Sequence, residues 1–134
     1  SILFLSGIHP AKGINEMSQA IHWLSENYPE YSFKFDIAGS GPGLDFLLSE
    51  LEEEINVNKV ELHGFVHGEE KWKLLHNACI FLFPSHHNEG YPNVILEAMA
   101  AGLPIIYTPV GALDEVLGHE NGIRIELEEL TGEE

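Results

Sequence analysis

Two glutamates eight positions apart, Glu89 and Glu97, flank the start of an apolar segment. Gly90 lets a ligand approach the backbone closely, and Pro92 suits the first turn of a helix. Glu97 lies within the apolar run Val94–Ala101, where an unpaired carboxylate is costly. We therefore expect it to meet a hydrogen-bonding partner, a solvent-filled cleft or a ligand hydroxyl. The alternative is a first-turn acid stabilised by the helix N-terminus, whose N–H groups could also receive a phosphate or the ring oxygens of a sugar.

The elements that must position these glutamates alternate between strand-like and helix-like patterns. Helical spacing of apolar residues follows each short apolar run, and this alternation predicts βαβ units with a parallel sheet. The run Cys79–Phe83 is almost wholly apolar, which indicates helices on both faces of the sheet. We expect a Rossmann-like, doubly wound, three-layer α/β domain with a mostly parallel sheet of about six strands. The expected strands are 2–6, 32–38, 59–63, 79–83, 104–108 and 122–126, and the expected helices are 14–27, 44–55, 69–77, 93–101 and 112–117.

Four loops are expected at the carboxyl ends of these strands, where such sheets bind ligands. They are Gly7–Gly13, Gly39–Gly43, Gly64–Gly68 and Pro84–Asn93, and three of them are richer in glycine than a connector requires. The second superficially resembles a dinucleotide fingerprint, but its G-x-G-x-G spacing after the second strand is more typical of a tight turn that starts a helix. His63, just before the third loop, could contact a base or cap its strand.

Composition limits the classes of function. The chain has 134 residues, 44% of them apolar, which suits one compact domain with a core. Its 6 basic and 22 acidic residues give a formal charge of −16, which argues against a nucleic-acid-binding module. The longest uncharged stretch, Ala98–Leu113, is broken by two glycines and two prolines, so no membrane-spanning helix is expected. Residues 127–134 are rich in glutamate and are expected to form a frayed tail.

The remaining reactive residue types have plain structural interpretations. Cys79 is the single cysteine, so no disulfide can form within the chain, and we expect it to be a buried small hydrophobe. Its solitude fits a reducing compartment. The adjacent His86 and His87 point in different directions and lack a third convincing ligand, so no metal site is expected. Trp23 and Trp72 are expected to be packing residues.

The segment EGYPNVILEAMAAGLP, from Glu89 to Pro104, resembles the E-x7-E signature of the family-4 (group 1) retaining glycosyltransferases. The resemblance covers nearly the whole chain, because AGSGP at 38–42 and GFV at 64–66 fall where the family has its G-x-G-P and G-x-v loops. It implies the C-terminal, donor-binding half of a two-domain GT-B enzyme. The downstream G…E…G pattern of the family is matched by Gly111, Glu115 and Gly122.

The resemblance implies a role for each matching residue. Glu97 would accept hydrogen bonds from the ribose hydroxyls of a nucleotide sugar. The two residues expected to be catalytic are Glu89, which would lie near the sugar hydroxyls, and Lys12, which would contact the diphosphate and help neutralise the leaving nucleotide. The other expected binding residues, beside the nucleotide or offering backbone amides to the hexose and diphosphate (Pro92 has no N–H), are Gly39, Gly41, Gly64, Phe65, Gly90, Tyr91, Pro92 and Asn93.

Two features depart from the family pattern. The family usually has an arginine five residues before the lysine, whereas this sequence has Gly7, so half of the cationic clamp is missing. Weaker donor affinity, charge supplied by the other domain, or loss of activity would each follow from that. The chain also stops before the C-terminal helix of the family and starts without methionine. We therefore expect residues 1–134 to be one domain of a longer protein that lacks its N-terminal acceptor domain here, and to be inactive alone.

The function predicted first is a donor-binding domain that passes a hexose from a UDP-, GDP- or ADP-sugar to a saccharide or lipid-linked acceptor, as in polysaccharide biosynthesis. No metal or other cofactor is required. The expected partners are the donor and the N-terminal domain, with no nucleic acid and with membrane contact only through that other half, in the cytoplasm or at the inner face of its membrane. The alternatives are a related GT-B sugar-nucleotide epimerase, a non-catalytic sugar-nucleotide-binding or scaffolding domain, favoured by Gly7, and, most distantly, a NAD-dependent oxidoreductase.

Overall fold

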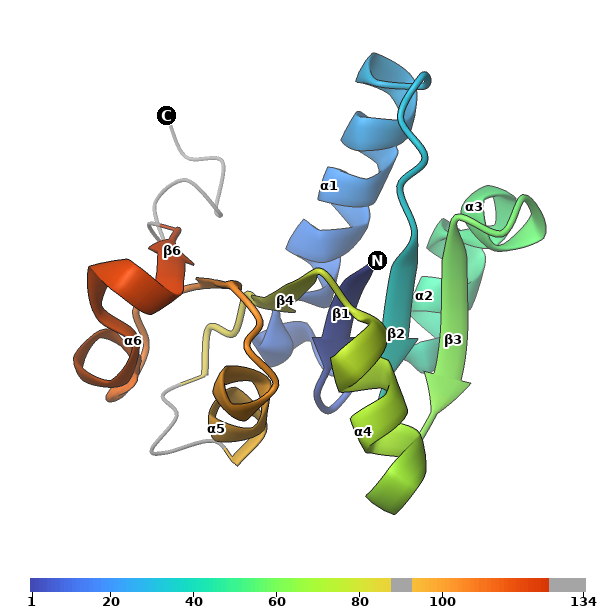
Figure 1. Cartoon of the computed structure of the whole chain (residues 1–134). Coiled ribbons are helices and arrows are strands. Elements are labelled where there is room, and N and C mark those ends of the chain that lie inside the picture. The colour runs from blue at the N-terminus through green and yellow to red at the C-terminus, as the bar shows by residue number, and fades with distance from the viewer. Residues whose placement is uncertain (88–92, 126–134) are drawn as a thin grey trace.

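The computed structural model describes residues 1–87 and 93–125 (Figure 1). Its strands form one six-stranded sheet in the order β3-β2-β1-β4-β5-β6, and every neighbouring pair is parallel. This is the strand order of a doubly wound dinucleotide-binding sheet, so the predicted Rossmann-like architecture is confirmed. The strands are β1 (Ile2–Leu5), β2 (Phe35–Ala38), β3 (Val60–Gly64), β4 (Ile80–Phe83), β5 (Ile105–Tyr107) and β6 (Gly122–Arg124).

Helices connect successive strands, as the sequence pattern predicts. The expected helix 44–55 is in fact two, because the backbone leaves helical geometry at Leu51, with φ −106° and ψ 19°. Within the described ranges no helix is long and apolar enough to cross a bilayer. The helices are η1 (Pro10–Lys12, a 3₁₀ turn), α1 (Ile14–Asn27), α2 (Leu44–Glu50), α3 (Glu52–Asn56), α4 (Gly68–Asn77), α5 (Asn93–Ala100) and α6 (Leu113–Asn121).

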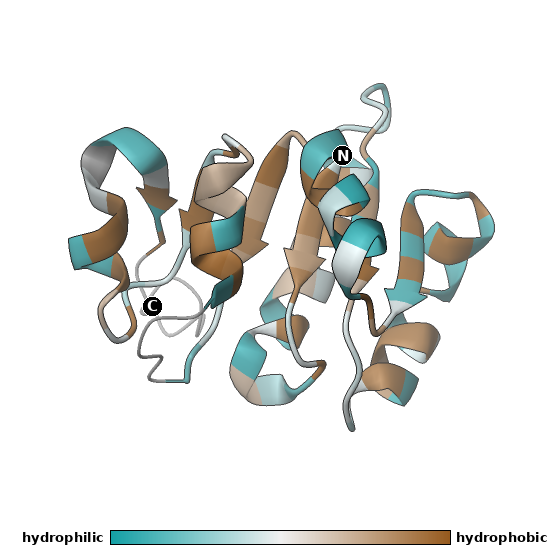
Figure 2. Cartoon of the chain, turned by 60° about the horizontal axis from the view of Figure 1, so that its bottom comes forward, coloured by the Kyte–Doolittle hydropathy of each residue, from teal (hydrophilic) through white to brown (hydrophobic). Residues whose placement is uncertain are grey.

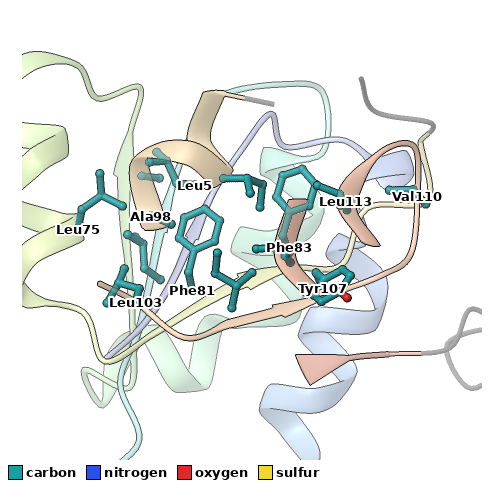
Figure 3. Packing of buried hydrophobic residues seen from close by; sticks show 14 of the residues in the cluster. Leu5, Leu75, Phe81, Phe83, Ala98, Leu103, Tyr107, Val110 and Leu113 are labelled. Carbon is teal, nitrogen blue, oxygen red and sulfur yellow. The ribbon is translucent and has the colours of Figure 1, made fainter. Parts of the chain in front are cut away.

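The sheet separates two hydrophobic cores, because successive side chains of a strand point to opposite faces. In β1, Phe4 joins the core formed with α1 and α2, whereas Leu3 and Leu5 join the core formed with α4, α5 and α6. Figure 2 shows the apolar strands lying between helices that carry hydrophilic stripes. In the second core, Phe81 and Phe83 of β4 pack under the helices (Figure 3). Burial on both faces explains why β4 lacks polar alternation.

The prediction that Cys79 is buried is wrong, and the two tryptophans expected to be packing residues are partly exposed. Cys79 is exposed, because β4 begins one residue later, at Ile80. Trp23 is 54% exposed and Trp72 is 36% exposed, since each lies away from the buried face of its amphipathic helix. Their rings lie against neighbouring exposed rings, with centroids 5.5 Å apart for Trp23 and Tyr28 and 5.8 Å apart for Trp72 and His76.

A histidine–carboxylate contact ties α1 to α3 and predicts a pH-dependent stability. His22 Nδ1 lies 2.7 Å from Oε1 of the buried Glu54, and Nε2 lies 3.6 Å from Glu50 Oε2. Partial burial lowers the pKa of His22, but the hydrogen bonds and charges of Glu54 and then Glu50 outweigh it and raise the pKa above its ordinary value. The stabilisation is therefore fully present below the unfolded pKa, about 6.5, and is lost as pH rises through the higher folded pKa.

We expect His22→Gln to lower the melting temperature most near pH 6 and progressively less towards pH 8. Thermal melts of wild type and variant at half-unit pH intervals measure this difference. Glu54→Gln removes the carboxylate partner and should flatten the same pH trend. A difference between wild type and His22→Gln that stays constant across this range would contradict the electrostatic origin.

Candidate functional site

The loops after β1 and β2 are joined by backbone hydrogen bonds at the carboxyl edge of the sheet. The amide of Ile8 donates to Ser40 O at 2.9 Å, and the amide of Gly43 donates to Ile8 O at 2.8 Å. Gly39 has φ +144°, and a Cβ there would lie 1.8 Å from Ser6 O. Only glycine can adopt this conformation at so close an approach, which explains the start of the glycine-rich loop.

The loop after β3 joins the same edge. The amide of Gly39 donates to Gly64 O at 2.8 Å, so β2 and β3 end side by side. Phe65, which follows Gly64, is 72% exposed, whereas Val66 is buried. The three loops therefore form a continuous rim of backbone around the ends of β1, β2 and β3.

A cavity of about 390 Å³ opens at this rim, a size that suits small-molecule sites. It lies at the carboxyl ends of β1, β2 and β3, and β1 is one of the two strands, β1 and β4, between which the strand order reverses, the point at which doubly wound sheets bind ligands. Its wall is formed by the loops after three strands and by the first turns of α4 and α5. The lining residues are Leu5, Ser6, Gly7, Gly39, Ser40, Phe65, Val66, His67, Lys71 and Val94.

Glu97 meets a cation of the cavity wall. Its Oε2 lies 2.6 Å from Nζ of Lys71, and the two side chains are only 19% and 25% exposed. Glu97 is the fifth residue of α5, and the first turn of that helix holds no acidic residue. The alternative of a first-turn acid is therefore wrong, and the expected hydrogen-bonding partner is a lysine.

Lys12 ends the 3₁₀ turn η1, which is held by a local cap. His9 Nδ1 accepts from the amide of Ala11 at 3.0 Å, and Gly13 follows in the left-handed conformation. Ala11 O accepts from the amides of His86 and His87, at 2.8 and 3.2 Å. The turn that bears Lys12 is thus attached to the loop after β4, the loop that leads towards Glu89.

The loop after β4 is also held by the residue that directly follows β5. Thr108, fully buried, donates through Oγ1 to Ser85 O, and Ser85 Oγ accepts from the amide of His87 at 3.2 Å. His86 Nε2 lies 3.0 Å from Oε1 of Glu16 on α1. The contacts of Thr108 with Ser85 and of His86 with Glu16 could not be predicted from the sequence, because each joins residues far apart in the chain.

The structure brings part of the predicted site together. Gly39 and Phe65 line the cavity, and Glu97 reaches it through Lys71. Gly41 and Gly64 lie in the same rim, and Asn93 is the exposed first residue of α5. Lys12 lies outside the described cavity lining, in the turn beside the loop after β4. The predicted residues Glu89, Gly90, Tyr91 and Pro92 fall outside the described residues, as does the tail 127–134.

Lys71 is the residue of this site that sequence reasoning missed. It stands in GEEKWK, an ordinary charged helix start, and its neighbours Trp72 and Lys73 are exposed. The signal that could have found it is its place in the first turns of a helix directly after a ligand-side loop. That placement puts Lys71 beside the cavity, which it lines.

His63 is not among the residues that line the described cavity, and its ring contacts a carboxylate of the neighbouring strand β2. Its Nε2 lies 2.8 Å from Oδ1 of the buried Asp36, and Glu61 Oε2 lies 3.8 Å away. The ligating atoms of these three residues lie within 4.8 Å of one another. Lys34 Nζ lies 3.0 Å from Glu61 Oε2 and 3.9 Å from Asp36 Oδ1, so an ammonium already supplies the positive charge there. We assign no metal to this cluster.

A sequence profile of the family described as glycosyl transferases group 1 matches residues 1–132. The chain belongs to the group 1 glycosyltransferases. An uncharacterized glycosyltransferase of Methanocaldococcus jannaschii is 39% identical over 124 residues, which are 91% of this chain and 30% of that protein. Glycogen synthase of Mycobacterium tuberculosis is 27% identical over 132 residues, 98% of this chain and 31% of the enzyme. The chain thus spans about 30% of the length of these group 1 relatives.

Solved glycosyltransferase structures share the fold. The pneumococcal O-GlcNAc transferase GtfA, in complex with UDP and GlcNAc, superposes with a TM-score of 0.76 at 23% identity and covers 93% of this chain and 24% of its own. The protein HepE of Anabaena, in complex with UDP, has a TM-score of 0.76 at 21% identity, and the match covers 93% of this chain and 34% of HepE. The group 1 chain therefore has the Rossmann-like architecture of the GT-B glycosyltransferases.

Proposed function

We propose that this chain is the nucleotide-sugar-binding domain of a retaining group 1 glycosyltransferase that passes a hexose to a saccharide or lipid-linked acceptor. The observation that carries the proposal is the cavity at the carboxyl edge of the sheet, which Gly39 and Phe65 line and which Glu97 joins through Lys71. Similar proteins that were solved with UDP support a nucleoside diphosphate as the occupant.

The geometry suggests how the site would hold such a donor. The rim of backbone after β1, β2 and β3 would receive the base, and the carboxylate of Glu97 would accept hydrogen bonds from the ribose hydroxyls. Lys12, fixed beside the loop after β4, would neutralise the departing diphosphate. Glu89 would lie near the sugar, and the backbone N–H groups of Gly90, Tyr91 and Asn93 would donate to the hexose and the diphosphate.

The acceptor site would belong to an N-terminal domain of the same protein. Residues 1–134 would then be one donor domain, inactive alone, and the whole enzyme would need no metal, because lysine and amides supply the electrostatic stabilisation. The chain spans about 30% of the length of its relatives, which supports a further domain.

Calorimetry with UDP, GDP, ADP, their sugars and NAD tests the proposal. We expect at least one nucleoside diphosphate to bind with a dissociation constant between micromolar and millimolar, about −8 to −4 kcal/mol. NAD should bind no better than a nonspecific control. Binding of NAD together with no binding of any nucleoside diphosphate would contradict the proposal.

Gly7 favours a second candidate, a domain that binds sugar nucleotides without transferring the sugar, because it stands where the family usually has an arginine of the cationic clamp. Gly7 lines the cavity, and a Cβ at this position would come no nearer to another residue than 3.9 Å, to Ser40 O. A Cβ would fit at position 7, so packing does not demand the glycine. Turnover of a donor by the full-length protein distinguishes the two candidates.

Two variants test the charge at the diphosphate. Lys12→Ala should weaken binding of a nucleoside diphosphate by about 1.5–3 kcal/mol and leave the nucleoside nearly unchanged, because a charge-assisted hydrogen bond is lost. Gly7→Arg should strengthen diphosphate binding, since it adds a cation at a position where a Cβ makes no close contact. Lys73→Ala, on the exposed face of α4, is the matched control. Equal affinities of wild type, Lys12→Ala and Gly7→Arg would show that neither position meets phosphate.

A further inference from the structure

The contact between Lys71 and Glu97 joins α4 to α5 at the cavity wall. The atoms Nζ and Oε2 are 2.6 Å apart, and about three quarters or more of each side chain is buried. Lys71 lines the cavity, whereas Lys73 on the same helix is exposed. Lys71 is therefore part of the cavity wall, whereas Lys73, two residues further along the same helix, is exposed to solvent.

This pair leaves hydrogen-bonding capacity on both partners. An ionised carboxylate accepts at about four lone-pair sites and an ammonium donates three hydrogen bonds, and the mutual contact uses one of each. A short charge-assisted contact also fixes the direction of the carboxylate. The pair can thus offer a ligand two acceptors of fixed direction beside a donor.

A ribose diol matches that combination. Its two vicinal hydroxyls are donors that a single carboxylate can accept together, and each hydroxyl oxygen can in turn accept from an ammonium. An isolated carboxylate in a partly buried wall would bear the desolvation cost alone and would lose its fixed direction when the site is empty.

We infer that Lys71 is a positioning residue that holds Glu97 for the ribose diol, so that the pocket selects nucleotides with both ribose hydroxyls over dideoxynucleotides. This inference rests on the proposed function of the chain. It assigns to Lys71 a part in donor selection that is separate from the diphosphate contact of Lys12. Lys71 thereby becomes the first-turn residue of α4 on which the affinity for the sugar part of the nucleotide depends.

A plain structural bridge between α4 and α5 would behave differently. Such a bridge would contribute to stability alone, and a partly exposed ion pair contributes little. Removing it would then leave the preference for the diol unchanged. The readout must therefore be the ratio of the affinities for ribonucleotide and dideoxynucleotide, which a stability effect does not move.

The test uses UDP, GDP and ADP with the 2′,3′-dideoxy counterpart of each, titrated by calorimetry into wild type, Lys71→Met and Lys73→Met. We expect wild type to prefer the ribonucleotide about tenfold or more, as for loss of a hydrogen bond to a charged group. Lys71→Met should lose most of this preference, with the dideoxynucleotide affinity changing less than about twofold. Lys73→Met should match wild type. Melting curves confirm that each variant is folded.

Two further variants keep the test decisive. Lys71→Arg retains a cation and should restore much of the preference if Lys71→Met loses it, and Glu97→Gln should lose the preference whether or not Lys71 is present. If Lys71→Met fails to fold, Lys71→Gln takes its place. An equal loss for both ligands, or no loss while wild type binds and prefers the diol, overturns the inference and leaves the proposed function standing. Failure of wild type to bind any of the three nucleotides overturns both.

Discussion

Gly39→Ala is expected to lower the free energy of unfolding by about 3 kcal/mol or more, because a methyl group has no room at the junction of β1 and β2. The built Cβ lies 1.8 Å from Ser6 O, a backbone atom that cannot rotate away, and φ is +144°. The loop after β2 must move outward to relieve the overlap. Since the amide of Gly39 also bonds to Gly64 O, that movement separates β2 from β3 at the cavity rim.

Gly64→Ala is the matched control for the steric part of this effect. Gly64 also has a positive φ, +72°, but a Cβ there meets nothing within 4 Å. Gly64→Ala should lower the free energy of unfolding only by the cost of placing alanine at a positive φ, about 1 kcal/mol. Urea unfolding of the two variants measures the difference. Equal losses at positions 39 and 64 would show that the loop after β2 adapts to the extra methyl group.

Much of the fold could be predicted from the sequence because its signals are local. The apolar run at β4 and the helical spacing of Ile14, Met17 and Ile21 each report their own surroundings, and alternation then implies the parallel sheet. The errors lie where an element ends. The sequence pattern places Cys79 inside the strand, but β4 begins at Ile80, and Cys79 is exposed rather than buried.

The candidate site was predictable only where a residue's type restricts its place. Gly39 and Phe65 follow strands directly, so a parallel sheet brings them to one edge. The partner of Glu97 was not predictable, because Lys71 is 26 positions away and stands in a segment with the composition of an ordinary solvated helix. The hydrogen bond from Thr108 to Ser85 could not be predicted for the same reason, since it forms only because β5 lies beside β4.

Phe81→Ala is expected to have the largest effect of the substitutions considered, a loss of about 3–5 kcal/mol in the free energy of unfolding. Phe81 is fully buried at the centre of the sheet, between Leu3 of β1 and Ile105 of β5 in the strand register. Helices cover its face of the sheet, so the cavity left by the ring cannot be filled by water or by a small shift of one loop (Figure 3). Urea unfolding measures the loss.

Phe46→Ala makes the same chemical change on α2, where the ring is 38% exposed. Because that ring already meets solvent, its removal should cost less than about 1.5 kcal/mol. Phe81→Leu, which keeps most of the buried volume, should fall between the two alanine variants. A loss at Phe81 no greater than at Phe46 would mean that the core beneath α4 and α5 can collapse around a missing ring. In that case α4 and α5, which carry Lys71 and Glu97, would shift when the core beneath them collapses. Nucleotide affinity should then fall along with stability in Phe81→Ala.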